Sequence, residues 1–233
     1  RDWSSDVCSS DLFKIVPTMY FPCQLDFRGR IYYVTDHLNP QGSDYARALL
    51  EFANGEPLTK QEHKDYLYCY GASLFGIKGS KADCLMWVES NKNKIIACSS
   101  NPWNNRWWQE AKERWQFLRW CKEYHDSFEK PNFKSHLPIT LDCTSSGLQI
   151  LSLLTGDPES AEHTNLTSRE SPSDIYGKVL GELQILLRKD DSDQARFWLG
   201  KQLDRNLTKP VCMTIPYGAT LYGIRNGVES WYR

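Results

Sequence analysis

Apolar and polar residues alternate along most of the chain at helical spacing. Apolar residues recur every three or four positions in several stretches, which predicts amphipathic helices that each bury one face. The expected helices span residues 58–75, 81–98, 104–124, 148–154, 174–187 and 194–203. Thr59 is a candidate N-cap of the first helix, and the helix at 104–124 has a broad apolar stripe. Helices therefore dominate the predicted fold.

Two shorter stretches predict strands. β-branched and aromatic residues follow the turn Asp26-Phe27-Arg28-Gly29-Arg30, which favours a strand from Ile31 onward, and residues 39–42 then mark a loop. The apolar run 137–142 ends in Asp142, and a turn of small residues follows it. The pattern predicts a short buried strand at 137–142 and an α+β fold that is mostly helical.

Composition suits a globular protein. The 233 residues can form one large domain or two small ones, and 40% of them are apolar and 24% charged. Aromatic residues make up 13%, which suits a deep core, a surface for stacking bases, or both. The formal net charge is −1, so no global basic field indicates nucleic-acid binding, although a local basic cleft can lie on a neutral protein.

The eight cysteines are scattered, with no CxxC pair and no cluster at zinc-ligand spacing. We expect reduced thiols that mostly pack in the core. No apolar run has the length of a membrane span and no secretory segment is visible, so we expect no membrane partner.

The sequence indicates that both ends are truncated. Residues 1–12 are polar and rich in Ser and Asp, and they resemble translated sequencing-adapter sequence; the alternative is a native disordered arm. The chain has no initiator Met and stops in the polar stretch 225–233. We exclude 1–12 from the predicted fold and divide the rest into regions 13–136 and 137–233.

Asp142 is a candidate metal ligand. A carboxylate at the end of a strand is held rigidly, and the backbone carbonyl of Cys143 can lie beside it as a second ligand. Magnesium prefers such oxygen ligands, and phosphoryl transfer from a nucleoside triphosphate needs divalent metals. On local sequence alone, the alternative is an aspartate that caps the next helix.

Residues 203–217 carry a second candidate site. Arg205, Lys209, Met213 and Tyr217 recur every four positions, so in a helix they lie along one slowly drifting stripe. Two cations followed by an aromatic residue suit a triphosphate followed by a base or ribose. The alternative is an ordinary solvated basic face with a core tyrosine.

Two prolines complicate this helix. Pro210 is expected to be tolerated only in a first helical turn, and Pro216 is expected to kink or end the helix. The stripe can therefore divide into two short segments, which leaves the direction of Tyr217 open.

In order and spacing, the two sites resemble those of the bacteriophage-type RNA polymerases, a single-subunit family that includes mitochondrial enzymes. Residues 138–149 are similar to the first family signature, with Cys143 where glycine is usual. The second signature is similar to Leu203-Asp204-Arg205, Lys209, Met213-Thr214 and Tyr217-Gly218. The Asp-Phe-Arg-Gly-Arg turn, the loop at 39–42, the Trp107-Trp108 pair and residues 121–124 also agree, so the resemblance covers about residues 13–225.

The resemblance implies part of a right-hand polymerase fold, namely the palm with the start of the fingers. It makes Asp142 the first metal-binding aspartate, with the Cys143 carbonyl beside it. The implied catalytic residues are Asp142, Lys209 and Tyr217. The implied nucleotide-binding residues are Arg205, Lys209, Met213, Tyr217 and Gly218. Tyr217 would help to select ribonucleotides, and Arg28 and Arg30 would lie near the template or hybrid backbone.

The implied activity is DNA-directed RNA synthesis with two Mg²⁺ ions, in which a 3′-hydroxyl attacks the α-phosphate and pyrophosphate leaves. The implied partners are a DNA template, nascent RNA and ribonucleoside triphosphates, and the family precedent is a monomer. The location would be the host cytoplasm for a phage enzyme, or mitochondria for an organellar or plasmid enzyme. The family's second aspartate lies beyond residue 233, so the 233 residues alone are expected to be inactive.

His125-Asp126-Ser127 is similar to the family's other metal motif, but we reject that assignment. The motif precedes Asp142, follows the Trp-rich helix in a predicted loop, and has no apolar hairpin around it. We expect a surface turn there.

Two alternatives stay open. One is a related single-subunit DNA polymerase, against which the Asp-Phe-Arg-Gly-Arg turn and residues 144–149 argue. The other is a non-catalytic, nucleic-acid-binding remnant of a decayed gene.

Overall fold

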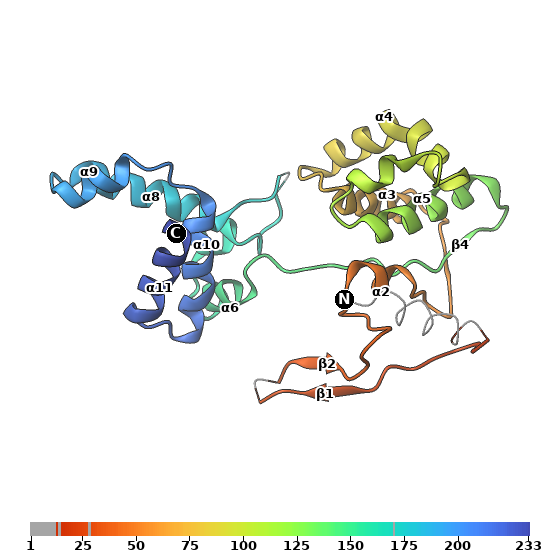
Figure 1. Cartoon of the computed structure of the whole chain (residues 1–233), viewed down its shortest axis with the longest axis horizontal. Coiled ribbons are helices and arrows are strands. Elements are labelled where there is room, and N and C mark those ends of the chain that lie inside the picture. Colours follow the sequence, from red (N-terminus) through yellow and green to blue (C-terminus); the bar gives the residue numbers. More distant parts are fainter. Residues whose placement is uncertain (1–12, 14, 28, 170) are drawn as a thin grey trace. The chain divides into compact units, whose positions relative to one another are not determined.

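The computed structural model describes residues 13, 15–27, 29–169 and 171–233, and the adapter-like segment 1–12 and Arg28 lie outside these residues. The chain divides into two compact units, which we call unit 1 (Arg1–Thr140) and unit 2 (Leu141–Arg233). Both units consist mainly of helices, and the described strands, all short, lie in unit 1, which confirms the mostly helical fold (Figure 1).

A short β-hairpin carries the basic turn in unit 1. β1 (Cys23–Leu25) pairs antiparallel with β2 (Ile31–Tyr33), so the strand expected after the turn is confirmed. The amide of Asp26 donates to the carbonyl of Arg30 at 3.0 Å. Gly29 has a φ of +75°, a left-handed conformation that glycine adopts without strain, and this closes the turn.

Three helices enclose the core of unit 1, as Figure 1 shows. They are α3 (Gln61–Phe75), α4 (Lys81–Ser100) and α5 (Arg114–Glu129). The smaller elements are α2 (Asp44–Ala48), which packs on α5, and β3 (Glu56–Pro57), which pairs with β4 (Lys134–Ser135). The expected helices are thus present, but Lys60 occupies the N-cap of α3, so the assignment of Thr59 was wrong.

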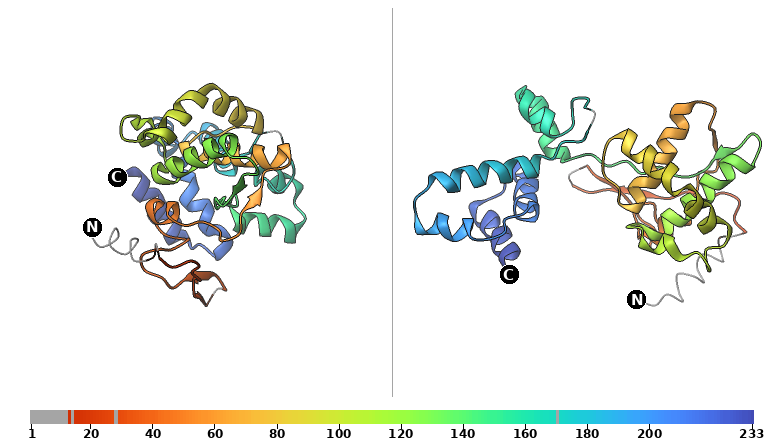
Figure 2. Two further views of the ribbon diagram at one scale, coloured as in Figure 1. Left: turned by 90° about the vertical axis from the view of Figure 1, so that its right-hand side faces the viewer. Right: turned by 90° about the horizontal axis from the view of Figure 1, so that it is seen from above.

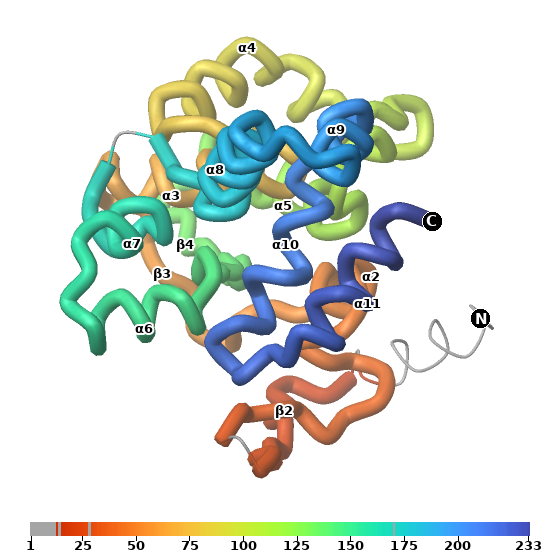
Figure 3. The backbone as a smooth tube through the Cα atoms, turned by 90° about the vertical axis from the view of Figure 1, so that its left-hand side faces the viewer, coloured from red at the N-terminus to blue at the C-terminus, as the bar shows by residue number. Residues whose placement is uncertain are grey.

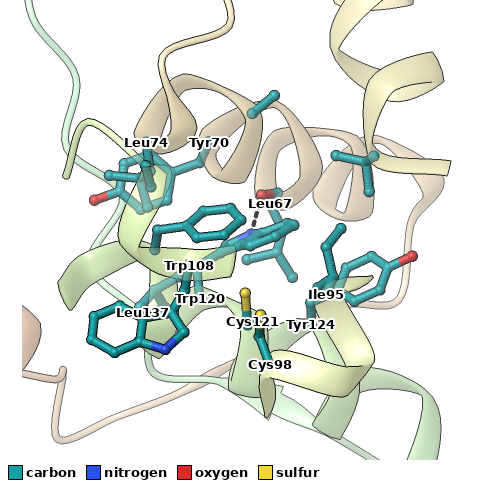
Figure 4. Close-up of a cluster of buried hydrophobic side chains, with 14 of the residues drawn as sticks. Leu67, Tyr70, Leu74, Ile95, Cys98, Trp108, Trp120, Cys121, Tyr124 and Leu137 are labelled. Atoms are coloured by element: carbon teal, nitrogen blue, oxygen red, sulfur yellow. Dashed lines mark hydrogen bonds between the residues drawn. The ribbon is translucent and has the colours of Figure 1, made fainter. Parts of the chain in front are cut away.

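The core of unit 1 is rich in aromatic side chains (Figure 4). Phe117, Trp120 and Tyr124 of α5 are all buried, and Phe117 belongs to the apolar stripe that the sequence predicted. The indole N–H of Trp120 donates to the carbonyl of Leu67 on α3 at 2.8 Å. Gly71 allows α3 to approach this ring, because a Cβ atom there would lie 2.0 Å from it.

The single helix expected at 104–124 is divided in two. Its first part is the 3₁₀-helix η1 (Arg106–Glu110), and α5 begins only at Arg114. Between them, the amides of Lys112 and Glu113 donate to the last two carbonyls of α3, at 3.2 and 3.0 Å. The final carbonyls of a helix have no partner within it, so the chain leaves the helical conformation here and caps α3.

Unit 2 is built from helices. In order they are α6 (Ser146–Thr155), α7 (Pro158–His163), α8 (Ile175–Lys189), α9 (Asp193–Leu199), α10 (Arg205–Thr214), η2 (Ile215–Tyr217) and α11 (Leu221–Tyr232). α10 packs against α8 and α11, and η2 packs against α6 (Figure 2, Figure 3). α6 and α8 confirm two predicted helices, α9 ends earlier than predicted, and the pattern did not predict α7 or α11.

The strand expected at 137–142 is not formed. The structure assigns no strand between β4 and α6, and Ile139 and Leu141 are 38% and 86% exposed. A strand satisfies its backbone groups by pairing with a neighbouring strand, and no described segment pairs with this one. An apolar run can suggest a strand, but it does not supply the partner.

The seven cysteines within the described part of the chain are all free. Cys84, Cys98, Cys121 and Cys212 are buried, which agrees with core thiols, whereas Cys23 and Cys143 are exposed. None of the described helices is long and apolar enough to cross a membrane.

Candidate functional site

The predicted stripe runs along the exposed side of α10, and its last member, Tyr217, lies beyond this helix in η2. Its members, Arg205, Lys209, Met213 and Tyr217, are all exposed. The opposite face of α10 is buried through Leu207, Thr208 and Cys212. Tyr217 is 61% exposed, so the alternative of a core tyrosine is wrong.

The two prolines act differently on this segment. Pro210 lies inside α10, beyond the first turn, so its expected restriction to a first turn was wrong. Because proline has no N–H, it leaves the carbonyl of Asn206 without the usual helical donor. Pro216 lies in η2, where the α-helix has ended as expected, and Gly218 then takes a left-handed φ of +78°.

The start of α10 is anchored by Asp204. This N-cap carboxylate accepts from the amide of Asn206 at 3.0 Å and from the indole N–H of Trp231 at 2.8 Å. These donors, Trp231 foremost, lower the pKa of Asp204. Trp231 belongs to α11, so the cap ties α11 to the turn from which Arg205 projects.

Arg205 has two partners on the segment that opens α8. Its Nε–H donates to Oδ2 of Asp174 at 2.7 Å, and its guanidinium carbon lies 4.8 Å from the ring centroid of Tyr176. The hydrogen bond to Asp174 raises the pKa of Arg205, which therefore stays charged. Lys209, one helical turn on, makes no hydrogen bond or ion pair with any described residue.

Asp142 is exposed at the start of unit 2. Its carboxylate makes no hydrogen bond or ion pair with the residues that the structure describes. The N-cap of α6 is Ser145, so the alternative in which Asp142 caps this helix is wrong. Both carboxylate oxygens are therefore available to a cation.

Tyr176 joins the segment after Asp142 to α10. The hydroxyl of Ser145 donates to the hydroxyl of Tyr176, and the carbonyl of Tyr176 accepts from Oγ1 of Thr208 at 2.9 Å. Ser145 has a φ of +53°, which is unusual for a residue with a side chain. Three residues span at most about 11 Å, so Asp142 lies within that Cα–Cα distance of Ser145.

A second contact joins the same segment to the far end of the stripe. A Cβ atom on Gly147 would lie 3.1 Å from Cβ of Pro216 and 3.3 Å from the hydroxyl of Tyr217. The turn after Asp142 therefore touches the Arg205 end through Tyr176 and the Tyr217 end through Gly147.

The residues fit one part of a magnesium site. Within the described part of the chain, no three His, Cys, Asp or Glu side chains gather in a metal-binding group. Asp142 and the adjacent carbonyl of Cys143 nevertheless suit an ion that takes one or two carboxylates and completes its shell with water and phosphate oxygens. The available donor set fits an ion that is shared with a phosphate ligand.

Arg30 lies in the hairpin turn of unit 1, where its side chain is exposed and its backbone amide donates to the Asp26 carboxylate at 3.0 Å. The other predicted backbone-contacting residue, Arg28, lies outside the described residues. The remaining site residues belong to unit 2.

The predicted loop at His125-Asp126-Ser127 was wrong, because these residues lie in the last turns of α5. Each side chain has a nearby partner. His125 contacts Ser99 at 3.2 Å, Asp126 pairs with Lys130 at 2.7 Å, and Ser127 donates to a backbone carbonyl at 2.6 Å. These contacts explain the motif as part of the packing of α5.

Asp174 and Tyr176, the two partners of Arg205, were not predicted from the sequence. An acidic and an aromatic residue at a helix start carry no local sign of a partner 31 residues away. Their role emerges only when α8 packs against α10.

The family described as DNA-dependent RNA polymerase matches residues 57–232. The chain belongs to this family. It is 36% identical to the mitochondrial DNA-directed RNA polymerase of Schizosaccharomyces pombe over 217 residues. This aligned region covers 90% of this chain and 19% of that protein. It is 38% identical over 232 residues to a probable DNA-directed RNA polymerase of Neurospora crassa, covering 97% of this chain and 25% of that protein.

A chloroplastic DNA-directed RNA polymerase of Nicotiana sylvestris is 35% identical over 225 residues, which is 90% of this chain and 23% of that protein. The chain thus spans between 19% and 25% of the length of these three polymerases. The resemblance to the single-subunit RNA polymerases is confirmed, and these relatives do not favour the DNA polymerase alternative.

Proposed function

We propose that the chain is part of a DNA-directed RNA polymerase and that unit 2 carries the site for the incoming ribonucleoside triphosphate, at the junction of palm and fingers. The exposed stripe on α10 and η2, packed against the turn that follows Asp142, carries this proposal. The guanidinium fork of Arg205 and the point charge of Lys209 suit phosphate oxygens. Met213 and Tyr217 continue the stripe with surfaces that suit a base and a ribose.

Tyr217 is the proposed ribose-selecting residue. Its hydroxyl lies beside Gly147, and Gly218 makes the left-handed turn that directly follows its ring. A site built to hydrogen-bond a substrate hydroxyl rejects the analogue that lacks it, because a polar group is then left unpaired. This chemistry suits discrimination between a ribonucleotide and a deoxyribonucleotide.

Asp142 and the carbonyl of Cys143 would hold one of two Mg²⁺ ions, and a bound ion would stabilise charge on the triphosphate. In the proposed reaction, the 3′-hydroxyl of nascent RNA attacks the α-phosphate and pyrophosphate leaves. Arg205 and Lys209 bind the phosphates and orient them for that attack. Arg28 and Arg30 would contact phosphates of the template or hybrid, which position a nucleic acid without reading its sequence.

The proposed enzyme works as a monomer on a DNA template. The organellar names of the relatives from Schizosaccharomyces pombe and Nicotiana sylvestris support a mitochondrial or plastid location over the host cytoplasm. A polymerase remnant that only binds nucleic acid would bind single strands with strong salt dependence and would not prefer triphosphates.

The test is equilibrium binding of ATP with Mg²⁺ to the 233-residue chain. Arg205→Ala and Lys209→Ala are each expected to weaken binding by about tenfold, which is typical of losing a hydrogen bond to a charged group. Lys189→Ala, an exposed lysine at the end of α8, is the control and should leave the affinity unchanged. Equal losses in all three variants would show a general charge effect and would overturn the proposed site.

A primer-extension assay tests the mechanism. Because these 233 residues carry one of the two proposed metal-binding aspartates, we expect no nucleotide addition by the isolated chain. Measurable extension that disappears in Asp142→Asn would contradict the need for a second aspartate.

A further inference from the structure

We infer that Asp174 is a positioning residue that orients the guanidinium of Arg205 for a triphosphate. The inference rests on the proposed function of α10. It adds a residue outside both sequence signatures and assigns it a geometric role.

Asp174 does not cap its helix with its side chain, although it occupies the N-cap position of α8. It is the N-cap of α8, where a carboxylate normally accepts hydrogen bonds from amides of the first turn, yet its side chain makes no such bond. Its Oδ2 accepts instead from Nε of Arg205 at 2.7 Å. Its Oδ1 is buried and has no hydrogen-bond partner among the described residues. An unpaired buried carboxylate oxygen is costly, so another requirement keeps Asp174 here.

The contact with Asp174 leaves the phosphate-binding edge of Arg205 free. A guanidinium carries one Nε–H and four Nη–H donors in a rigid plane. Asp174 uses the Nε–H, and the Nη groups form no hydrogen bond with any described residue. Two parallel Nη–H groups match two oxygens of one phosphate. The side chains of Arg205 and Asp174 are 43% and 41% exposed, so a ligand can reach them.

Tyr176 fixes the plane of the guanidinium. Its ring lies under the Arg205 side chain, and the residue is only 4% exposed. Its hydroxyl is bound by Ser145 and its carbonyl by Thr208, so the ring is held by two other elements. Asp174 at the edge and Tyr176 at the face together define one orientation of Arg205.

The direction in which the loss of the Asp174 carboxylate changes the affinity for phosphate distinguishes a positioning role from simple competition. If the Asp174 carboxylate merely competes with phosphate for Arg205, its removal leaves an extra positive charge and tightens anion binding. If Asp174 orients Arg205, its removal frees the side chain to adopt other rotamers and weakens binding, despite the more favourable charge.

The experiment is calorimetric titration of the 233-residue chain with inorganic tripolyphosphate. Asp174→Ala is expected to weaken binding by about tenfold. Asp174→Asn should keep most of the affinity, because its amide oxygen still accepts from Nε–H. The matched control is Asp193→Ala, which changes the charge equally and breaks an exposed pair with Arg196 at 3.3 Å. This control should not change the affinity.

Two further measurements complete the test. The Arg205 Nε–H signal in nitrogen-15 NMR should exchange slowly in the wild type and in Asp174→Asn, and rapidly in Asp174→Ala. Thermal unfolding checks that each variant folds, and Asp174→Ser, which can still cap α8, replaces the alanine variant if that does not fold.

Unchanged or tighter binding by Asp174→Ala overturns the positioning role. If Arg205→Ala also binds tripolyphosphate normally, the proposed phosphate site itself is wrong. In the Arg205→Ala background, Asp174→Ala should have no further effect.

Discussion

Gly71 lies in the middle of α3, where a glycine usually weakens a helix by roughly 1 kcal/mol relative to alanine. The ring of Trp120 fills the space in which a Cβ atom would lie, 2.0 Å from the nearest ring atom. The ring cannot easily retreat, because its N–H is bound to the carbonyl of Leu67. Close packing with α5 therefore outweighs the helix propensity of alanine at this position.

Gly71→Ala is expected to lower the free energy of unfolding by about 1–3 kcal/mol, because the added methyl group overpacks the core. Urea unfolding followed by tryptophan fluorescence measures the change. Gly181→Ala in α8 is the control, since no described atom lies within 4 Å of its Cβ position. The control should be neutral or stabilising by up to about 1 kcal/mol, and equal stability of both variants would contradict the described packing.

Asp83 adds a pH dependence at the start of α4. The Ser80 hydroxyl and amide donate to its carboxylate at 2.7 and 2.9 Å, and these bonds lower the pKa of Asp83 from its ordinary value of 3.8. A depressed folded-state pKa stabilises the fold above the unfolded-state value, and this stability is lost as pH falls through the folded-state pKa.

Asp83→Asn is therefore expected to be less stable than the wild type at neutral pH. The stability difference should begin to shrink as the pH falls below about 3.8, where the unfolded chain binds a proton, and should be lost below the lower folded-state pKa, where the native carboxylate is neutral too. Denaturant unfolding over a pH series measures it. A difference in unfolding free energy that stays constant with pH would show that the charge of Asp83 does not contribute to the cap.

At the scale of elements, α10 combines the exposed face proposed to bind the triphosphate with an internal proline. Pro210 removes one backbone donor and crowds the preceding turn, which generally costs a helix about 3 kcal/mol. The buried face of α10, through Leu207 and Cys212, holds the helix against its neighbours.

Pro210→Ala is expected to stabilise unit 2 by roughly 1–3 kcal/mol, since it restores a donor to the Asn206 carbonyl. Thermal unfolding followed by circular dichroism measures this change. A loss of stability would instead indicate that the proline ring makes contacts that an alanine cannot replace.

Elements whose cause is local were predictable from the sequence. Periodicity located α3, α4, α6 and α8, and the four-residue spacing identified the exposed face of α10. The break before α5 was not predictable, because its cause is the unsatisfied end of α3. The prediction of a strand at 137–142 was wrong for a related reason, since the backbone pairing of a strand depends on a segment that is distant in the sequence. The contact between Asp174 and Arg205 likewise has no local signal.

At the scale of the whole chain, the two units differ in how much apolar surface they bury. Unit 1 has a continuous core of aromatic and aliphatic side chains. In the described part of unit 2, the buried hydrophobic residues are Tyr176, Ala195, Leu207 and Cys212. On α6, Ile150, Leu153 and Leu154 are more than half exposed. Unit 1 should therefore be the more stable part.

Limited proteolysis of the whole chain is expected to remove unit 2 first and to leave a resistant fragment from unit 1. Cleavage rates follow the free energy of local opening, which is lower where fewer apolar side chains are buried. Mass spectrometry of the fragments over time gives the order. A fragment of unit 2 that outlasts unit 1 would contradict the comparison.

Cys143 has a practical consequence for all of these measurements. Its thiol is exposed directly beside Asp142. Cys23 is the other exposed thiol in the described part of the chain, and Cys8 lies outside it. Replacing those two with serine would leave Cys143 as the most accessible point for attaching a maleimide dye. This exposed thiol thus offers an attachment point for an optical reporter, one residue from the carboxylate proposed to hold the ion.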